Sequence, residues 1–200
     1  MAALLGACGG SDSSTDSDEP TGTFQVKVTE AKFPTPQRLG QTSLLELGIR
    51  NTGDRPVPGL LVTFTVAGKR GESSSLPFGL NDPQPELAQS DRPVWVLATT
   101  YPRLSGSTRP GGASTANRKT FSFGVLKPGK TVKAVWKLSA VRAGKFDLLY
   151  RIGAGPGGEA KAETEGGVAP GGSFSTEITE RLPETEVTDS GEIVEIKKGK

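Results

Sequence analysis

Hydrophobic and polar residues alternate over most of the chain beyond residue 22, with the period of two that β-strands require. The clearest case is the stretch 126–155, where Pro128-Gly129 turns the chain into one alternating segment and Ala143-Gly144 turns it into a second. The predicted inward side chains are Val132, Ala134, Trp136, Leu138, Phe146, Leu148, Tyr150 and Ile152. We therefore predict two long strands joined as a ribbon, with Trp136 in the core.

The same alternation recurs on both sides of this ribbon. It predicts further strands near residues 24–28, 45–50, 60–66 and 174–178, and a terminal pair of short strands around Val187 and residues 193–196 with Gly191 in its turn. The glycine-rich stretch after Ile152 is predicted to be a flexible connection. No segment has the periodicity of an amphipathic helix, so we predict an all-β sandwich of roughly seven to nine strands.

Residues 67–119 form a segment longer than an ordinary connection between sandwich strands, and we interpret it as an insertion. Its proline-rich first part is predicted to be irregular, residues 94–99 to be a strand, and residues 103–118 to be a polar loop. Trp95 and Tyr101 are candidates for a ligand platform, because flat rings suit the faces of sugars. Packing of these rings in the core is the favoured alternative.

Several turn and core residues carry a resemblance to a known family. The turn Asn51-Thr52-Gly53 follows an alternating strand, Leu126 with Pro128-Gly129 precedes another, and Gly144 opens a third. This pattern resembles the cell-adhesion-related domain found in bacteria (CARDB), an immunoglobulin-like sandwich of secreted and surface proteins. The resemblance implies that fold over residues 23–200 and leaves the ligand open.

The N-terminal segment Leu4-Leu5-Gly6-Ala7-Cys8 resembles a bacterial lipobox. The resemblance implies cleavage before Cys8, acylation of its thiol, and anchoring of the protein outside the cytoplasmic membrane. Only seven residues precede Cys8 and none is basic, so residues 1–8 are interpreted as a lipobox with a truncated signal peptide. The alternative is an apolar N-terminus with a free thiol.

Residues 9–22 are rich in serine, glycine and aspartate and contain no aliphatic or aromatic side chain. Such a segment has nothing to bury, so we predict a disordered acidic linker with a span of about 20 Å. The acidic residues lack the ligand spacing of a calcium-binding loop. The segment is therefore interpreted as a short tether between Cys8 and the sandwich.

The net charge of +2 is too small to indicate a nucleic-acid-binding protein, but the basic residues are unevenly distributed. Nine of them, against one acidic residue, lie between positions 118 and 151. Lys133, Lys137 and Arg151 take the outward phase of the predicted ribbon, where they could contact an anionic envelope polymer, lipid headgroups or another surface protein. The favoured alternative is that these charges aid solubility and protect a sheet edge.

The chain has no histidine, and its single cysteine cannot form an intramolecular disulfide. Ser-His and Cys-His catalysis and the common zinc sites are therefore unavailable, and we predict no catalytic residue, cofactor or metal. The sequence predicts a non-catalytic, lipid-anchored interaction or structural module of the cell envelope, monomeric and without nucleic acid. The alternative is a ligand-binding lipoprotein whose site, for a small molecule or carbohydrate, lies at the insertion.

Overall fold

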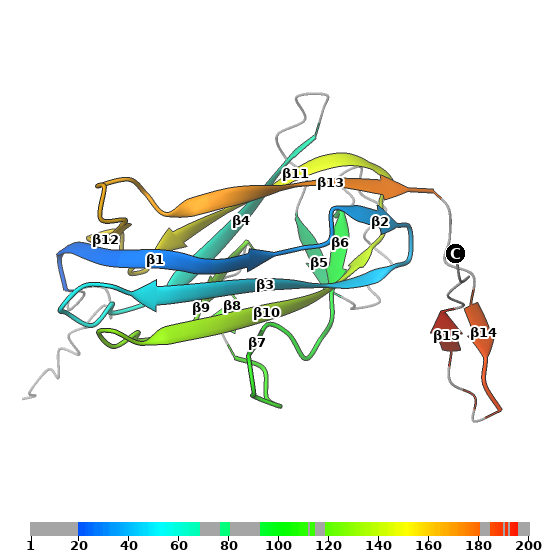
Figure 1. Ribbon diagram of the computed structural model, residues 1–200, viewed down its shortest axis with the longest axis horizontal. Helices are drawn as coiled ribbons and strands as arrows, with labels where there is room; N and C mark the ends of the chain where they lie inside the picture. The colour runs from blue at the N-terminus through cyan, green and yellow to red at the C-terminus, as the bar shows by residue number, and fades with distance from the viewer. Residues whose placement is uncertain are drawn as a thin grey trace, which may run out of the picture.

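The computed structural model describes residues 20–68, 77–80, 93–111, 113–114, 119–180, 185–189, 191 and 193–195. The regular structure in these residues consists of fifteen β-strands (Figure 1). The all-β prediction is confirmed. None of the described residues belongs to a helix that could cross a membrane.

The first sheet is built around two long antiparallel pairs. Its strand order is β12 (Ala160–Glu163), β1 (Gly22–Lys32), β3 (Thr42–Asn51), β10 (Thr131–Ala140), β6 (Trp95–Leu97) and β5 (Phe78–Leu80), and β7 (Arg103–Leu104) also pairs with β10. β10 therefore has neighbours on both of its edges.

The second sheet has the order β2 (Pro36–Arg38), β13 (Gly171–Thr179), β11 (Gly144–Gly153), β4 (Leu61–Gly68), β9 (Thr120–Ser122) and β8 (Ala113–Ser114). A separate hairpin pairs β14 (Thr185–Val187) with β15 (Ile193–Glu195). The predicted terminal pair of short strands is thus confirmed.

The two sheets pack face to face, and successive strands often belong to different sheets, so the chain passes repeatedly between the layers, for example after β3 and after β10. The central strands β1, β3 and β10 face β4, β11 and β13, which is the arrangement of an immunoglobulin-like sandwich. The predicted immunoglobulin-like fold is confirmed. Figure 1 shows β1 beginning at the same end of the sandwich at which β11 ends and β13 begins.

The predicted ribbon is wrong in one respect, because β10 and β11 do not pair with each other. β10 pairs with β3, and β11 pairs with β13 and β4 in the opposite sheet. The short connection at residues 141–143 carries the chain from one layer to the other. Both strands still turn their predicted apolar faces into the same core, where Trp136 and Leu148 are fully buried.

An aromatic cluster fills the core beneath β10. The ring centroids of Phe64, Phe121 and Phe123 lie 5.1, 5.8 and 5.6 Å from that of Trp136, all in edge-to-face geometry. Trp136 has no exposed surface. Its predicted place in the core is confirmed.

The described part of the 67–119 segment belongs to the sandwich, which corrects the prediction that its proline-rich portion is irregular. β5 lies within that portion and pairs in parallel with β6. It forms a strand because Phe78 packs into the core, 5.0 Å from the ring centroid of Phe64. Short strands also interrupt the predicted polar loop, at β7 and β8.

The glycine-rich stretch after β11 also contains a strand that the sequence pattern did not predict. β12 pairs in parallel with the start of β1, from Gly22 to Gln25. Its two inward residues, Ala160 and Ala162, are buried, but alanine carries little β-propensity. Pairing with β1 rather than local preference therefore forms this strand.

The turn that carries the family resemblance is held by one buried amide. Asn51 Nδ2 donates hydrogen bonds of 2.8 Å to the carbonyl oxygens of Arg55 and Leu126, and its Oδ1 accepts one of 2.9 Å from the Gly53 N–H. Asn51 is completely buried. Its side chain thus ties the end of β3 to two connecting segments.

Candidate functional site

The three basic residues predicted to form one outward face lie on two faces. Lys133 and Lys137 lie on β10 in the first sheet, whereas Arg151 lies on β11 in the second. Packed sheets are separated by about 10 Å, and these side chains point away from the shared core. The predicted single basic surface is therefore wrong, and each residue must be considered in its own surroundings.

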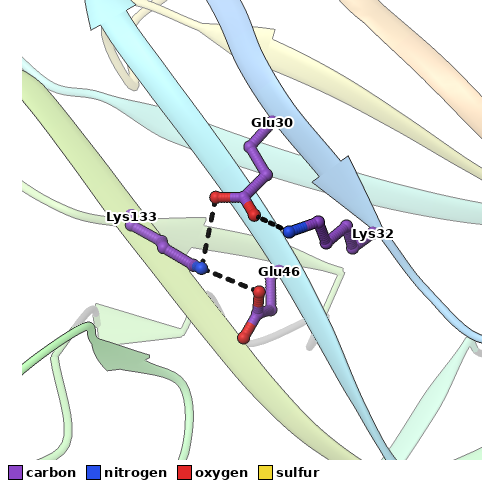
Figure 2. Close-up of polar contacts among 4 residues, drawn as sticks. All are labelled: Glu30, Lys32, Glu46 and Lys133. Carbon is purple, nitrogen blue, oxygen red and sulfur yellow. Dashed lines mark ion pairs between the residues drawn. The ribbon is translucent and has the colours of Figure 1, made fainter.

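Lys133 is the centre of an ion-pair cluster on the outer face of the first sheet (Figure 2). Its Nζ lies 3.2 Å from Glu30 Oε2 and 2.8 Å from Glu46 Oε2. Lys32 Nζ lies 2.5 Å from the other oxygen of Glu30. The ammonium group of Lys133, which was predicted to contact an anionic partner, is thus already paired with two carboxylates.

Gly48 makes this cluster possible. Gly48 on β3 pairs with Glu30 on β1 and with Lys133 on β10, so these three residues form a row across the sheet. The middle residue of this row has no side chain. A Cβ at Gly48 would lie 2.7 Å from Thr29 Oγ1 and 3.0 Å from Glu30 Cβ. The alternative prediction of edge protection is also wrong for Lys133, because β10 is flanked on both sides.

The ion pairs shift the pKa values of both charge types. Hydrogen bonds from Lys32 and Lys133 lower the pKa of Glu30 below its usual 4.5. Hydrogen bonds to Glu46 and Glu30 raise the pKa of Lys133 above its usual 10.5. Each shift favours the charged form of its group in the folded state.

These shifts predict a pH dependence of stability. The contribution of Glu30 is present above its unfolded pKa of 4.5 and is lost as the pH falls through the lower folded value. The contribution of Lys133 is present below 10.5 and is lost as the pH rises through the higher folded value. We expect Lys133→Gln to reduce the loss of stability at acidic pH and the loss of stability at alkaline pH. Urea denaturation midpoints across both pH ranges measure the two effects.

Lys137→Gln is the matched control for this experiment, because Lys137 lies exposed on the same strand. It should retain the parent's pH dependence. Parallel pH profiles for the parent and Lys133→Gln would show that the cluster does not contribute to stability.

Trp95 and Tyr101 do not form the predicted platform. Trp95 is fully buried, with its ring edge-to-face with Phe33 and its Nε1 donating a 2.9 Å hydrogen bond to Gln37 Oε1. Tyr101 is partly buried, and the Arg103 guanidinium lies 4.7 Å from its ring centroid. The platform prediction is wrong because Trp95 has no face exposed to a ligand, and the alternative of core packing is correct for this residue.

Cys8 and residues 9–19 lie outside the described residues. Their predicted roles, as a lipid attachment site and as part of the tether, remain predictions. The described part of the chain contains no group of three histidine, cysteine, aspartate or glutamate side chains that could hold a metal ion.

Arg151 lies in an open groove on the outer face of the second sheet. The groove has a volume of about 570 Å³. Its lining comes from three neighbouring strands and the segment before β13, and consists of Thr63, Thr65, Leu149, Tyr150, Arg151, Ala169, Pro170, Gly171, Gly172 and Ser173. We call this surface the Arg151 groove.

Strand register explains the hollow. Arg151 stands opposite Gly171, and Leu149 stands opposite Ser173, so two long side chains of β11 border two short ones of β13. Gly171 is required there, since a Cβ would lie 2.5 Å from the Tyr150 carbonyl oxygen. The groove thus follows from the small residues at the start of β13.

The groove combines three kinds of chemistry. The guanidinium of Arg151 is always charged and binds carboxylates well, threonine and serine supply hydroxyl groups, and Leu149 is 40% exposed. Sequence reasoning identified Arg151 but missed Leu149, Gly171 and Ser173. The pair Gly171-Gly172 at the start of a strand was the available signal.

The comparisons with known proteins concern the fold. The chain matches no family model and no curated protein. The CARDB domain of a Pyrococcus furiosus protein is similar in structure at a TM-score of 0.45 and 11% identity, covering 80% of this chain and 98% of that one.

Two further solved structures are similar to the same extent. Native α2-macroglobulin of Escherichia coli, from domain MG7 to its C-terminus, has a TM-score of 0.42 and 18% identity, covering 84% of this chain and 21% of that one. A cohesin module of a Clostridium perfringens family 33 glycoside hydrolase has a TM-score of 0.42 and 12% identity, covering 79% of this chain and 98% of that one. Likeness at this level carries no argument about function.

Proposed function

We propose that this protein is a non-catalytic interaction module of the bacterial cell envelope, anchored by a lipid on Cys8, and that it binds an acidic partner at the Arg151 groove. One observation carries the proposal. The groove is an open hollow with a fixed cation, hydroxyl groups and an exposed leucine side by side. This combination suits a partner that brings both a carboxylate and an apolar group.

The position of the groove agrees with an anchor at the N-terminus. β1 begins at the end of the sandwich at which β11 ends and β13 begins (Figure 1), and Arg151 and Gly171 belong to that end. A tether of about 20 Å would hold this end close to the membrane. The proposed partner therefore lies in the same membrane-proximal zone.

A binding role rather than a catalytic one is supported by acid–base groups that are missing from the chain or engaged in ion pairs. The chain has no histidine, and the carboxylates of Glu30 and Glu46 are engaged by Lys133. The alternative of a ligand site at the insertion gains no support from the described strands, because β5 and β6 direct Phe78 and Trp95 into the core.

Cell fractionation tests the anchor. With the gene expressed from its full upstream start, we expect the parent in the membrane fraction and Cys8→Ser in the soluble fraction. A diacylglyceryl group supplies two acyl chains, which is enough for stable anchoring, so one side chain should decide the partition. Ser11→Ala, in the adjacent linker, is the control and should stay with the membrane. A Cys8→Ser variant that remains as firmly bound to the membrane as the parent would contradict lipid anchoring at Cys8.

Chemical crosslinking in the same cells tests the groove. We expect a product of the parent to be lost in Arg151→Glu, because the substitution reverses the charge of the one charged residue among the described residues that line the groove. Lys137→Glu makes the same charge change on the opposite sheet and should retain the product. Equal crosslinking by Arg151→Glu and the parent would contradict binding at the groove.

A further inference from the structure

β13 forms the border of the second sheet over most of its length. It pairs with β11 at residues 171–178 but with β2 only at residues 177–179 (Figure 1). Within the described part of the chain, no strand pairs with the remaining border at residues 171–176. This border adjoins the Arg151 groove.

The backbone groups that point toward the open border can be identified. The Ile152 N–H donates to the Pro170 carbonyl oxygen, so even-numbered residues of β13 bond to β11, and the Glu177 N–H donates outward to Thr35. Bonding alternates along an antiparallel pair. The N–H and C=O groups of Gly171, Ser173 and Ser175 therefore point outward in extended geometry.

Nothing on β13 protects this border against pairing. Residues 171–176 contain no charged residue and no proline. The border of β1 beyond β12, in contrast, carries Lys27 and Lys32 and an irregularity between Val28 and Glu30. Charges and bulges are the usual means by which proteins block the pairing of exposed strands. The open border of β13 is thus suited to receive a strand.

The groove also reaches the border without obstruction. Gly171 and Ser173 are the residues between the border and the side chains of Arg151 and Leu149. A strand added to β13 would lie roughly 10 Å from β11, two strand spacings away. An acidic side chain on the added strand and the long side chain of Arg151 can meet across Gly171.

We propose that the border of β13 binds an extended peptide segment of a partner protein as an added strand. An acidic residue of that segment pairs with Arg151, and an apolar residue two positions away contacts Leu149. The inference rests on the proposed function and specifies its partner. An anionic polysaccharide could use Arg151 but has no extended peptide backbone to pair with Gly171, Ser173 and Ser175, so the border favours a peptide.

Amide chemical shifts of the full chain test this proposal, with Cys8→Ser to keep it free of lipid. The probe is the capped peptide acetyl-Thr-Thr-Asp-Thr-Leu-Thr-Thr-amide, and its counterpart has lysine in place of aspartate. We expect the aspartate peptide to shift the amides of Gly171, Ser173 and Ser175 at a concentration about tenfold lower than the lysine peptide requires. The reason is that its carboxylate gains a charge-assisted hydrogen bond with Arg151. In Arg151→Glu the preference between the two peptides should reverse.

A matched pair of lysine variants tests the border separately from the groove. Ser175→Lys places a protecting charge on the border, outside the residues that line the groove, and should abolish peptide binding, whereas Ala67→Lys adds the same charge to the same face on β4 and should not. Both positions are exposed, so the unfolding midpoints should remain similar.

Three outcomes would overturn the inference. They are the absence of shifts at these amides with millimolar aspartate peptide, equal binding of the two peptides, and unchanged binding in Ser175→Lys. If the polyuronate alginate shifts the Arg151 side-chain signal while the peptide leaves the border unaffected, the partner is an anionic polymer. The peptide inference then falls and the proposed binding at the groove stands.

Discussion

Trp136→Ala is expected to lower the free energy of unfolding by about 3–5 kcal/mol. Trp136 is fully buried at the centre of the first sheet, and three phenylalanine rings pack edge-to-face around it. Alanine would leave a cavity that Phe64, Phe121 and Phe123 cannot fill, since each is held by its own strand or connection. Urea denaturation followed by far-UV circular dichroism measures the loss.

Two further substitutions make this result specific. The Trp136 indole N–H is buried and has no hydrogen-bond partner, so Trp136→Phe loses volume but no bond and should cost less than half as much. Lys137→Ala, at the next position but exposed, should change stability by no more than about 0.5 kcal/mol. An unchanged denaturation midpoint in Trp136→Ala would contradict the packing of Trp136 against the three phenylalanine rings.

Asn51→Ala is expected to lower the free energy of unfolding by roughly 2–4 kcal/mol, because it removes several hydrogen bonds at a buried site. The Leu126 and Arg55 carbonyl oxygens each lose a donor, and the Gly53 N–H loses its acceptor. These groups fix the end of β3 against two connections. Chemical denaturation of the purified variant measures the effect.

Neighbouring substitutions separate hydrogen bonding from volume. Asn51→Asp keeps an acceptor for Gly53 but loses both donors and buries a charge, so at neutral pH it should be no more stable than Asn51→Ala. The Thr52 hydroxyl has no partner, so Thr52→Ala should lie within about 0.5 kcal/mol of the parent. If Asn51→Ala proved as mild as Thr52→Ala, Asn51 would not be holding the turn.

The sequence by itself determined the long strands and the side of each that faces the core. Alternation is a local property, so Trp136 and Leu148 could be assigned to the interior without knowledge of their neighbours. The turn at Asn51 could likewise be predicted, because the preference of glycine and asparagine for turns depends only on the backbone within a few residues. The all-β sandwich followed from the spacing of such strands, and its immunoglobulin-like form was what the resemblance to CARDB implied.

Only the tertiary structure decided which strands are neighbours and in which register. Alternation places Lys133 and Arg151 outward, but it does not show that they lie on opposite sheets, or that Glu30 meets Lys133 across Gly48. β5 and β12 have too little local preference to be recognised and form by pairing with distant strands. The Arg151 groove exists because Gly171 and Ser173 align with Arg151 and Leu149, an alignment between distant segments that no local pattern encodes.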